Sequence, residues 1–187
     1  MSFVIAGIID NKLYMACDGQ VTNEDGTIKS NNYKKIKKVG TNVLIGYAGT
    51  LQICEKALEE MHNLNNLYID NVYELAQVIV NNLNMIYSEN HINRNLHKAQ
   101  IIVGSHNQLY SINSINNTIN RINTPKLPKI EFVKVIPPNL SSTTIDQIIE
   151  SEFSYGITNI QKQLKNIVIE ISKKDSTVNN NVYVEYI

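Results

Sequence analysis

The stretch Met15–Thr22, MACDGQVT, ends an apolar run on the acidic residue Asp18 and continues with glycine, glutamine and further β-forming residues. Upstream, Ser2–Ile9 (SFVIAGII) is an almost unbroken β-forming run, and the DN pair at 10–11 supplies a tight turn. Together these features predict a β-hairpin. A hairpin returns the end of its second strand to the start of its first, so we expect Asp18 to lie beside Ser2.

Outward from this hairpin, the chain alternates between strand and helix patterns. Turn signals at 25–26 and 40–41 divide the rest of the opening quarter into short strands. The apolar spacing then becomes helical and predicts two amphipathic helices. They are marked by Leu51, Cys54, Leu58 and Met61, and by Val72, Leu75, Ala76, Ile79, Leu83, Ile86 and Tyr87.

The second half repeats this order. Strands are expected in AQIIVGS, QLYSIN and TINRIN, in the proline-punctuated edge segment TPKLPKIEFVKVIPP, and in the closing NVYVEYI. Two helices precede the closing strand, one opening at the capping residues SSTT and one marked by apolar residues between 160 and 171. Strands followed by helices, twice over, suggest sheets covered by helices on their outer faces.

Composition limits the partners of the chain. Its 187 residues, 43% hydrophobic and 18% charged, fit a single globular domain over 1–187. Basic and acidic residues number 17 each, so no basic footprint favours nucleic acid or an anionic membrane as partner. Cys17 and Cys54 lack metal or redox spacing, and the chain shows no signal peptide or long apolar span. We therefore expect a cytoplasmic protein.

Several familiar kinds of site are absent from the sequence. The four histidines lack the spacing of a zinc site, and no glycine-rich loop opens a helix as a phosphate site requires. The chain also contains no G-x-S-x-G motif for a Ser-His-Asp triad. No metal and no cofactor is therefore expected.

The N-terminus offers different chemistry. Removal of Met1, which a small second residue permits, would leave Ser2 with a hydroxyl nucleophile and a free α-amine. Such an amine titrates at about 7.7–8.0, so near neutral pH it can accept the hydroxyl proton. A nearby lysine would lower the pKa of the amine, and a carboxylate would orient that lysine. Lys35 and Asp18 are the candidates for these two roles.

Ser2 and three short blocks resemble the proteasome β-subunit family of N-terminal nucleophile hydrolases. The blocks are ACDGQVT (16–22), NNYKK (31–35) and LIGYAGT (44–50). The likeness is greatest to the bacterial proteasome-like peptidase that works with a ring ATPase. It implies an α/β (α+β) four-layer αββα sandwich of two antiparallel sheets flanked by helices. It also implies hydrolysis of peptide bonds of unfolded polypeptides inside a homo-oligomeric ring, with an ATPase unfoldase as a possible partner.

The resemblance also implies roles for individual residues. Ser2 is the nucleophile, Asp18 orients Lys35, Gly46 donates the oxyanion-hole N–H, and Asp175 is the family's closing aspartate. Thr22 and Ala48 match positions whose backbone groups hold the substrate as an added strand. The primary specificity pocket is expected near four further residues, Val21, Tyr33, Lys37 and Leu44.

Two departures from the family pattern leave alternatives open. Val178 and the asparagines at 179–180 replace a serine and glycines, and VIPPNLSS replaces a glycine-serine turn before the third helix. Both family serines support the lysine and the terminal amine. A catalytically impaired structural ring subunit and a small-substrate amidase therefore remain alternatives, and retention of Met1 would block the amine.

Overall fold

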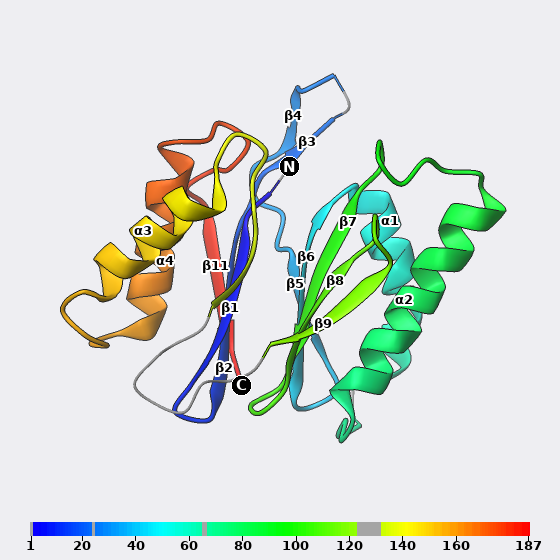
Figure 1. The fold of residues 1–187 in the computed structure, drawn as a ribbon, viewed down its shortest axis with the longest axis horizontal. Coiled ribbons are helices and arrows are strands. Elements are labelled where there is room, and N and C mark those ends of the chain that lie inside the picture. The colour runs from blue at the N-terminus through cyan, green and yellow to red at the C-terminus, as the bar shows by residue number, and fades with distance from the viewer. Residues whose placement is uncertain (1, 24, 65–66, 123–131) are drawn as a thin grey trace.

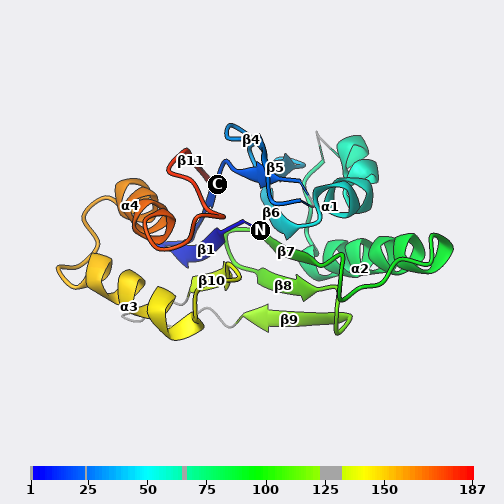
Figure 2. The same cartoon turned by 90° about the horizontal axis from the view of Figure 1, so that it is seen from above.

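A computed structural model describes residues 2–23, 25–64, 67–122 and 132–187. Two antiparallel sheets pack face to face, and each carries a pair of helices on its outer face (Figure 1). The view from above shows the four layers in the order helices, sheet, sheet, helices (Figure 2). The predicted four-layer sandwich of two antiparallel sheets between helices is confirmed.

The first sheet contains the predicted hairpin. Its strand order is β10-β1-β2-β11. The bounds are Val4–Ile9 for β1, Lys12–Asp18 for β2, Phe132–Val135 for β10 and Val182–Tyr186 for β11. Asp10 and Asn11 form the turn with positive φ angles of 49° and 58°, a conformation that two-residue hairpins need and that Asp and Asn tolerate. β10 lies at the sheet edge, as predicted, while 123–131 lie outside the described residues.

The second sheet has the order β5-β6-β7-β8-β9. The bounds are Ile36–Val39 for β5, Val43–Gly49 for β6, Ala99–Gly104 for β7, Leu109–Asn113 for β8 and Thr118–Ile122 for β9. A separate two-stranded hairpin, β3 (Val21–Thr22) with β4 (Ile28–Ser30), projects beyond one end of the sandwich next to the N-terminus (Figure 1).

The helices bury the predicted apolar faces. α1 (Leu51–Ala57) and α2 (Val72–Glu89) pack on the second sheet, and α3 (Ser142–Phe153) and α4 (Ile160–Ser172) pack on the first. The first predicted helix is shorter than its apolar spacing indicated, because α1 ends at Ala57 and a 3₁₀ segment, Glu59–Leu64, follows. No described helix is both long enough and apolar enough to cross a bilayer.

Alternation along β1 explains how one short strand serves two layers. Phe3 and Ile5 face α3 and α4, whereas Val4 and Ala6 face the second sheet. All four side chains are fully buried. The start of β1 is thereby held between two cores, and Ser2, which precedes it, is held with it.

Candidate active site

Asp18 lies at the end of β2 opposite the start of β1, as the hairpin predicts. Its backbone N–H donates to Phe3 O at 3.3 Å, and its side chain is fully buried. Oδ1 accepts the Phe3 N–H at 2.8 Å, and Oδ2 accepts the Gln20 N–H at 2.8 Å. These two backbone donors fix the carboxylate in one orientation.

Lys35 completes the bonding of this carboxylate. Its Nζ lies 3.0 Å from Asp18 Oδ2 and 3.1 Å from Asp18 O, and its side chain is 3% exposed. Burial lowers the pKa of Lys35 below its usual value, although the charge and hydrogen bond of Asp18 act in the opposite direction. Lys35 is thus a buried ammonium that gives up a proton more readily than a surface lysine.

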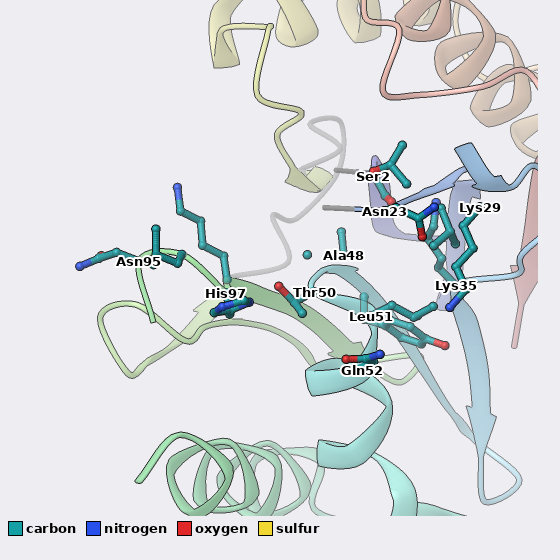
Figure 3. Close-up of a pocket in the computed structure, with 16 residues that line it drawn as sticks. Ser2, Asn23, Lys29, Lys35, Ala48, Thr50, Leu51, Gln52, Asn95 and His97 are labelled. Atoms are coloured by element: carbon teal, nitrogen blue, oxygen red, sulfur yellow. The ribbon is translucent and has the colours of Figure 1, made fainter. Parts of the chain in front are cut away.

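Ser2 shares a pocket with Lys35. The pocket has a volume of about 810 Å³, and its walls come from the chain start, the β3–β4 hairpin, the end of β6 and the segment before β7. Ser2 is buried, and its Oγ donates to Gln20 O at 3.3 Å. Figure 3 shows Ser2 and Lys35 on one side of this pocket, with Ala48 and Thr50 opposite the serine.

Gly46, expected to donate to an oxyanion, has its N–H in a β-ladder instead. Tyr47 donates its backbone N–H to Lys35 O at 3.1 Å, so Tyr47 faces β5. Successive N–H groups alternate along a strand, and the N–H of Gly46 therefore faces its partner Ile102 on β7. A Cβ at Gly46 would lie 2.5 Å from Met15 Sδ, which explains the glycine by close packing between the sheets. Gly46 does not line the pocket.

Gly49 has the geometry that Gly46 lacks. By the same alternation its N–H lies on the β5 side of β6, but β5 begins only at Ile36, so none of the described strands has a residue paired with Gly49 on that side. Gly49 lines the pocket. Its φ of 117° and a Cβ that would lie 2.1 Å from Lys98 O both require glycine. The need for glycine at this backbone position, rather than the apolar-glycine motif around Gly46, therefore identifies Gly49 as the candidate oxyanion donor.

The expected substrate-binding residues divide into two groups. Val21, Thr22 and Ala48 line the pocket. Tyr33 and Lys37 do not, but both contact the pocket residue Tyr47. The Tyr33 hydroxyl lies 3.3 Å from the Tyr47 hydroxyl, and Lys37 Nζ lies 5.7 Å from the Tyr47 ring centroid.

Leu44 lies away from the pocket. It is 1% exposed and packs in the core between the two sheets. Its side chain faces inward because Leu44 has the same parity along β6 as Gly46. The expected role of Leu44 in substrate binding is therefore corrected to one in packing.

Asp175 is buried but does not line the pocket. Oδ1 accepts from Thr177 N at 2.8 Å and from Asn139 Nδ2 at 3.1 Å, and Oδ2 accepts from Asn139 N at 3.1 Å. Burial acts to raise the pKa of Asp175, but the hydrogen bonds from Thr177 and Asn139 outweigh it and hold the pKa below its usual value. Asp175 thus joins the end of α4 to the loop before α3.

Two residues that the sequence analysis did not select support the site. Gln20 accepts the Ser2 hydroxyl through its backbone oxygen, while its Nε2 donates to Ser176 O at 2.9 Å. Asn179 Oδ1 accepts the Gly19 N–H at 2.9 Å, and its Nδ2 donates to Asn31 O at 2.8 Å. The sequence pattern does not predict these roles, because single Gln and Asn residues outside a helix or strand repeat follow no apolar periodicity.

The described part of the chain contains no cluster of side chains that could hold a metal ion. No group of three or more His, Cys, Asp or Glu residues there is arranged to hold an ion. The chemistry available is that of a hydroxyl, a lysine–aspartate pair and backbone N–H groups.

Comparison with known proteins gives relatives by structure alone. No family model and no curated protein matches the sequence. Three similar structures are a eukaryotic HslV, the Anbu complex and a BPH. HslV from Trypanosoma brucei has a TM-score of 0.66 at 16% identity and covers 98% of both chains. BPH from Thiobacillus denitrificans, in complex with epoxomicin, has a TM-score of 0.72 at 12% identity and covers 99% of this chain and 97% of its own.

The third structure is a helical assembly of Anbu, the ancestral β-subunit, from Pseudomonas aeruginosa. It has a TM-score of 0.73 at 11% identity and covers 99% of this chain and 80% of that one. The chain has the proteasome β-subunit fold. In this proteasome-like fold Ser2, Lys35 and Gly49 meet at one end of the sandwich, and the resemblance stated on sequence blocks is confirmed at the level of the fold.

Proposed function

We propose that the chain is an N-terminal serine peptidase of a proteasome-like homo-oligomeric ring, acting on peptide bonds of unfolded polypeptides. One observation carries the proposal. Lys35 lines the same pocket as Ser2, and its Nζ lies 3.0 Å from Oδ2 of the buried Asp18. A buried ion pair gives little stability compared with apolar packing, so its position beside a hydroxyl favours a chemical role.

The mechanism follows from the groups at the pocket wall. After removal of Met1, Ser2 Oγ attacks the scissile carbonyl carbon, and the Ser2 α-amine accepts the hydroxyl proton. The carbonyl electrons move to oxygen, and Gly49 N–H donates to that oxyanion. Collapse expels the amine product, which takes up the proton and leaves an ester on Ser2. A water molecule then hydrolyses this ester with the same amine as base.

Lys35 and Asp18 set the conditions for these steps. The ammonium of Lys35 lowers the pKa of a neighbouring α-amine and stabilises negative charge on the attacking oxygen. Asp18 keeps Lys35 charged and oriented, since its own carboxylate is held by Phe3 and Gln20. The main chain of Thr22 and Ala48 would hold the substrate as an added strand.

Assembly into a ring is part of the proposal. The helical assembly of Anbu, a neighbour in structure, supports repeated subunit contacts for this chain. Large apolar side chains are exposed on this chain, among them Tyr155 at 94% and Tyr68 at 60%. A ring ATPase is the possible partner that would supply unfolded chains. Light scattering on purified protein tests the assembly, and a monomer throughout the micromolar range would contradict it.

Labelling with epoxomicin, the compound present in the BPH structure, tests the nucleophile. We expect intact-mass spectrometry to show that Met1 is absent and peptide mapping to place the adduct on Ser2. Ser2→Ala should abolish both the adduct and turnover of a fluorogenic peptide. Ser88→Ala, which changes an exposed serine on α2, is the matched control and should retain both. An adduct that persists in Ser2→Ala would contradict the assignment.

A non-catalytic ring subunit is the second candidate. Val178 is 3% exposed and packs in the core with α4, so it presents no hydroxyl where the family has a serine. Absence of turnover from a Met1-processed, assembled protein would favour this candidate. Asn179 Oδ1 accepts the Gly19 N–H, and Gln20 Nε2 donates to Ser176 O. These bonds favour the active enzyme, because they order the site without that serine.

A further inference from the structure

The pocket beside Ser2 has an uneven charge. The described residues that line it include three lysines, Lys29, Lys35 and Lys98, and none of the lining residues is acidic. Asp18 neutralises Lys35 from behind the pocket wall. The salt bridges found among the described residues involve neither Lys29 nor Lys98. Within the described part of the chain, neither of these two lysines therefore has an ion-pair partner.

These two lysines come from opposite walls. Figure 3 shows Lys29 on the side of Ser2 and Lys35, and Asn95 and His97 across the pocket, with Ala48 and Thr50 between. Lys98 follows His97 directly in the chain and also lines the pocket. A peptide lying along Ala48 would thus have a lysine available on either side.

Lys98 is held in place by its backbone. Its carbonyl oxygen accepts the Thr50 N–H at 2.7 Å, and the next residue, Ala99, pairs with Gly49 in the sheet. Lys98 is half-buried, whereas Lys29 is exposed. Asp25, in the same hairpin as Lys29, accepts hydrogen bonds from Thr27 N at 2.9 Å and Thr27 Oγ1 at 2.6 Å. Its carboxylate is therefore already engaged locally.

The charge of the pocket does not follow from the composition of the chain. Lysine plus arginine equals aspartate plus glutamate at 17 each, so a pocket with lysines and no acidic lining residue is a local feature. A cleft lined by one sign of charge raises the local concentration of ligands of the opposite sign. It also raises the affinity for a complementary side chain that comes within a few ångströms.

From this geometry we propose that the pocket selects peptides that carry an acidic side chain next to the scissile bond, with Lys98 as the main determinant and Lys29 as the second. The inference rests on the proposed peptidase function and names its substrate class. Partly exposed ion pairs shift an equilibrium by about two- to fivefold, so selectivity of that size is expected at low salt.

The test compares matched fluorogenic peptides that differ only by Glu or Gln, at each position around the cleavage point. The measured quantity is the ratio of kcat/KM for the Glu and Gln peptides at 50 and 500 mM NaCl. We expect a ratio of about two to five at 50 mM that falls at 500 mM, because salt screens exposed charges. Lys98→Gln should bring the low-salt ratio close to one, and Lys98→Arg should preserve it.

Lys12→Gln is the matched control. Lys12 is an exposed lysine next to the β1–β2 turn, and Figure 1 shows this turn at the opposite end of the sandwich from the N-terminus. Its replacement should leave turnover and the ratio unchanged. A wild-type ratio of one at every position, or a ratio that Lys98→Gln does not lower, would overturn the proposal.

Binding separates this inference from the proposed hydrolysis. Fluorescence anisotropy of labelled Glu and Gln peptides with Ser2→Ala reports affinity without chemistry. Tighter binding of the Glu peptide that is lost in Lys98→Gln would support the charge selectivity even if the unmutated protein cleaves nothing, a result that would defeat the peptidase proposal alone. Equal affinities for both peptides would overturn the selectivity whatever the turnover.

Discussion

Replacement of Lys35 by alanine tests the central pair of the site. The change leaves Asp18, fully buried, with two backbone donors and no cation. Removal of one partner from a buried ion pair destabilises a protein by about 3–5 kcal/mol, because the remaining charge is uncompensated. The neighbouring Lys34 pairs with Glu185 at 2.5 Å, with side chains 43% and 38% exposed, and such a pair contributes about 0.2–1 kcal/mol.

Urea unfolding and fluorogenic peptide turnover measure the two consequences. We expect Lys35→Ala to lower the free energy of unfolding by about 3–5 kcal/mol and to remove nearly all turnover, since both the amine pKa and nucleophile activation depend on that charge. Lys34→Ala, the adjacent control, should stay within about 1 kcal/mol of the unmutated protein and keep its activity.

A double variant separates folding from chemistry. Asp18→Asn combined with Lys35→Met removes both charges of this buried pair, so it should regain part of the stability lost in Lys35→Ala while remaining inactive. Turnover in Lys35→Ala close to that of Lys34→Ala would refute the role of the lysine. Turnover restored in the double variant would refute the chemical role and leave only a structural one.

Three further outcomes follow from the same geometry. Gly49→Ala should lose both turnover and stability, because its Cβ would meet the Lys98 backbone. The Cβ of Gly46→Ala would meet mainly side chains, so this variant should retain measurable turnover of a fluorogenic peptide at a temperature where it remains folded. The lowered pKa of Asp175 contributes stability that is fully present above about pH 3.8 and is lost as the pH falls further, so acid titration of Asp175→Asn should show a shallower loss than the unmutated protein. Burial raises the pKa of Cys17 and of Cys54 to about 12, so iodoacetamide at pH 8 should label neither thiol until urea unfolds the protein.

Local patterns were sufficient for the elements that hold the site. The turn at 10–11 determines the register of the first hairpin, and an antiparallel register then places Asp18 opposite Phe3. Helical apolar spacing likewise identified α2 and α4 with the faces they bury. The end of α1 was missed, because the 3₁₀ segment continues to bury Met61 at nearly helical spacing.

The sequence by itself determined that Asp18 would lie at Ser2, because both belong to one hairpin and strand pairing is a local property. Tertiary structure alone decided between Gly46 and Gly49. The two glycines share one strand, but their N–H groups face opposite sides of it, and only Gly49 lines the pocket. Whether an N–H on the β5 side has a strand partner depends on where β5 begins, a consequence of packing between chain segments that no motif within β6 contains.

The same reason explains the other site residues. Lys35 reaches Asp18 only because β5 and β6 bring the second sheet against the first. Tyr33 and Leu44 were assigned to the pocket by their position in the family motif. The direction of each side chain depends instead on the layer against which it packs: Tyr33 packs against the core under α1 and α2, and Leu44 packs between the two sheets. A linear pattern specifies the partners within an element, whereas contacts between layers depend on the buried surfaces of the whole fold.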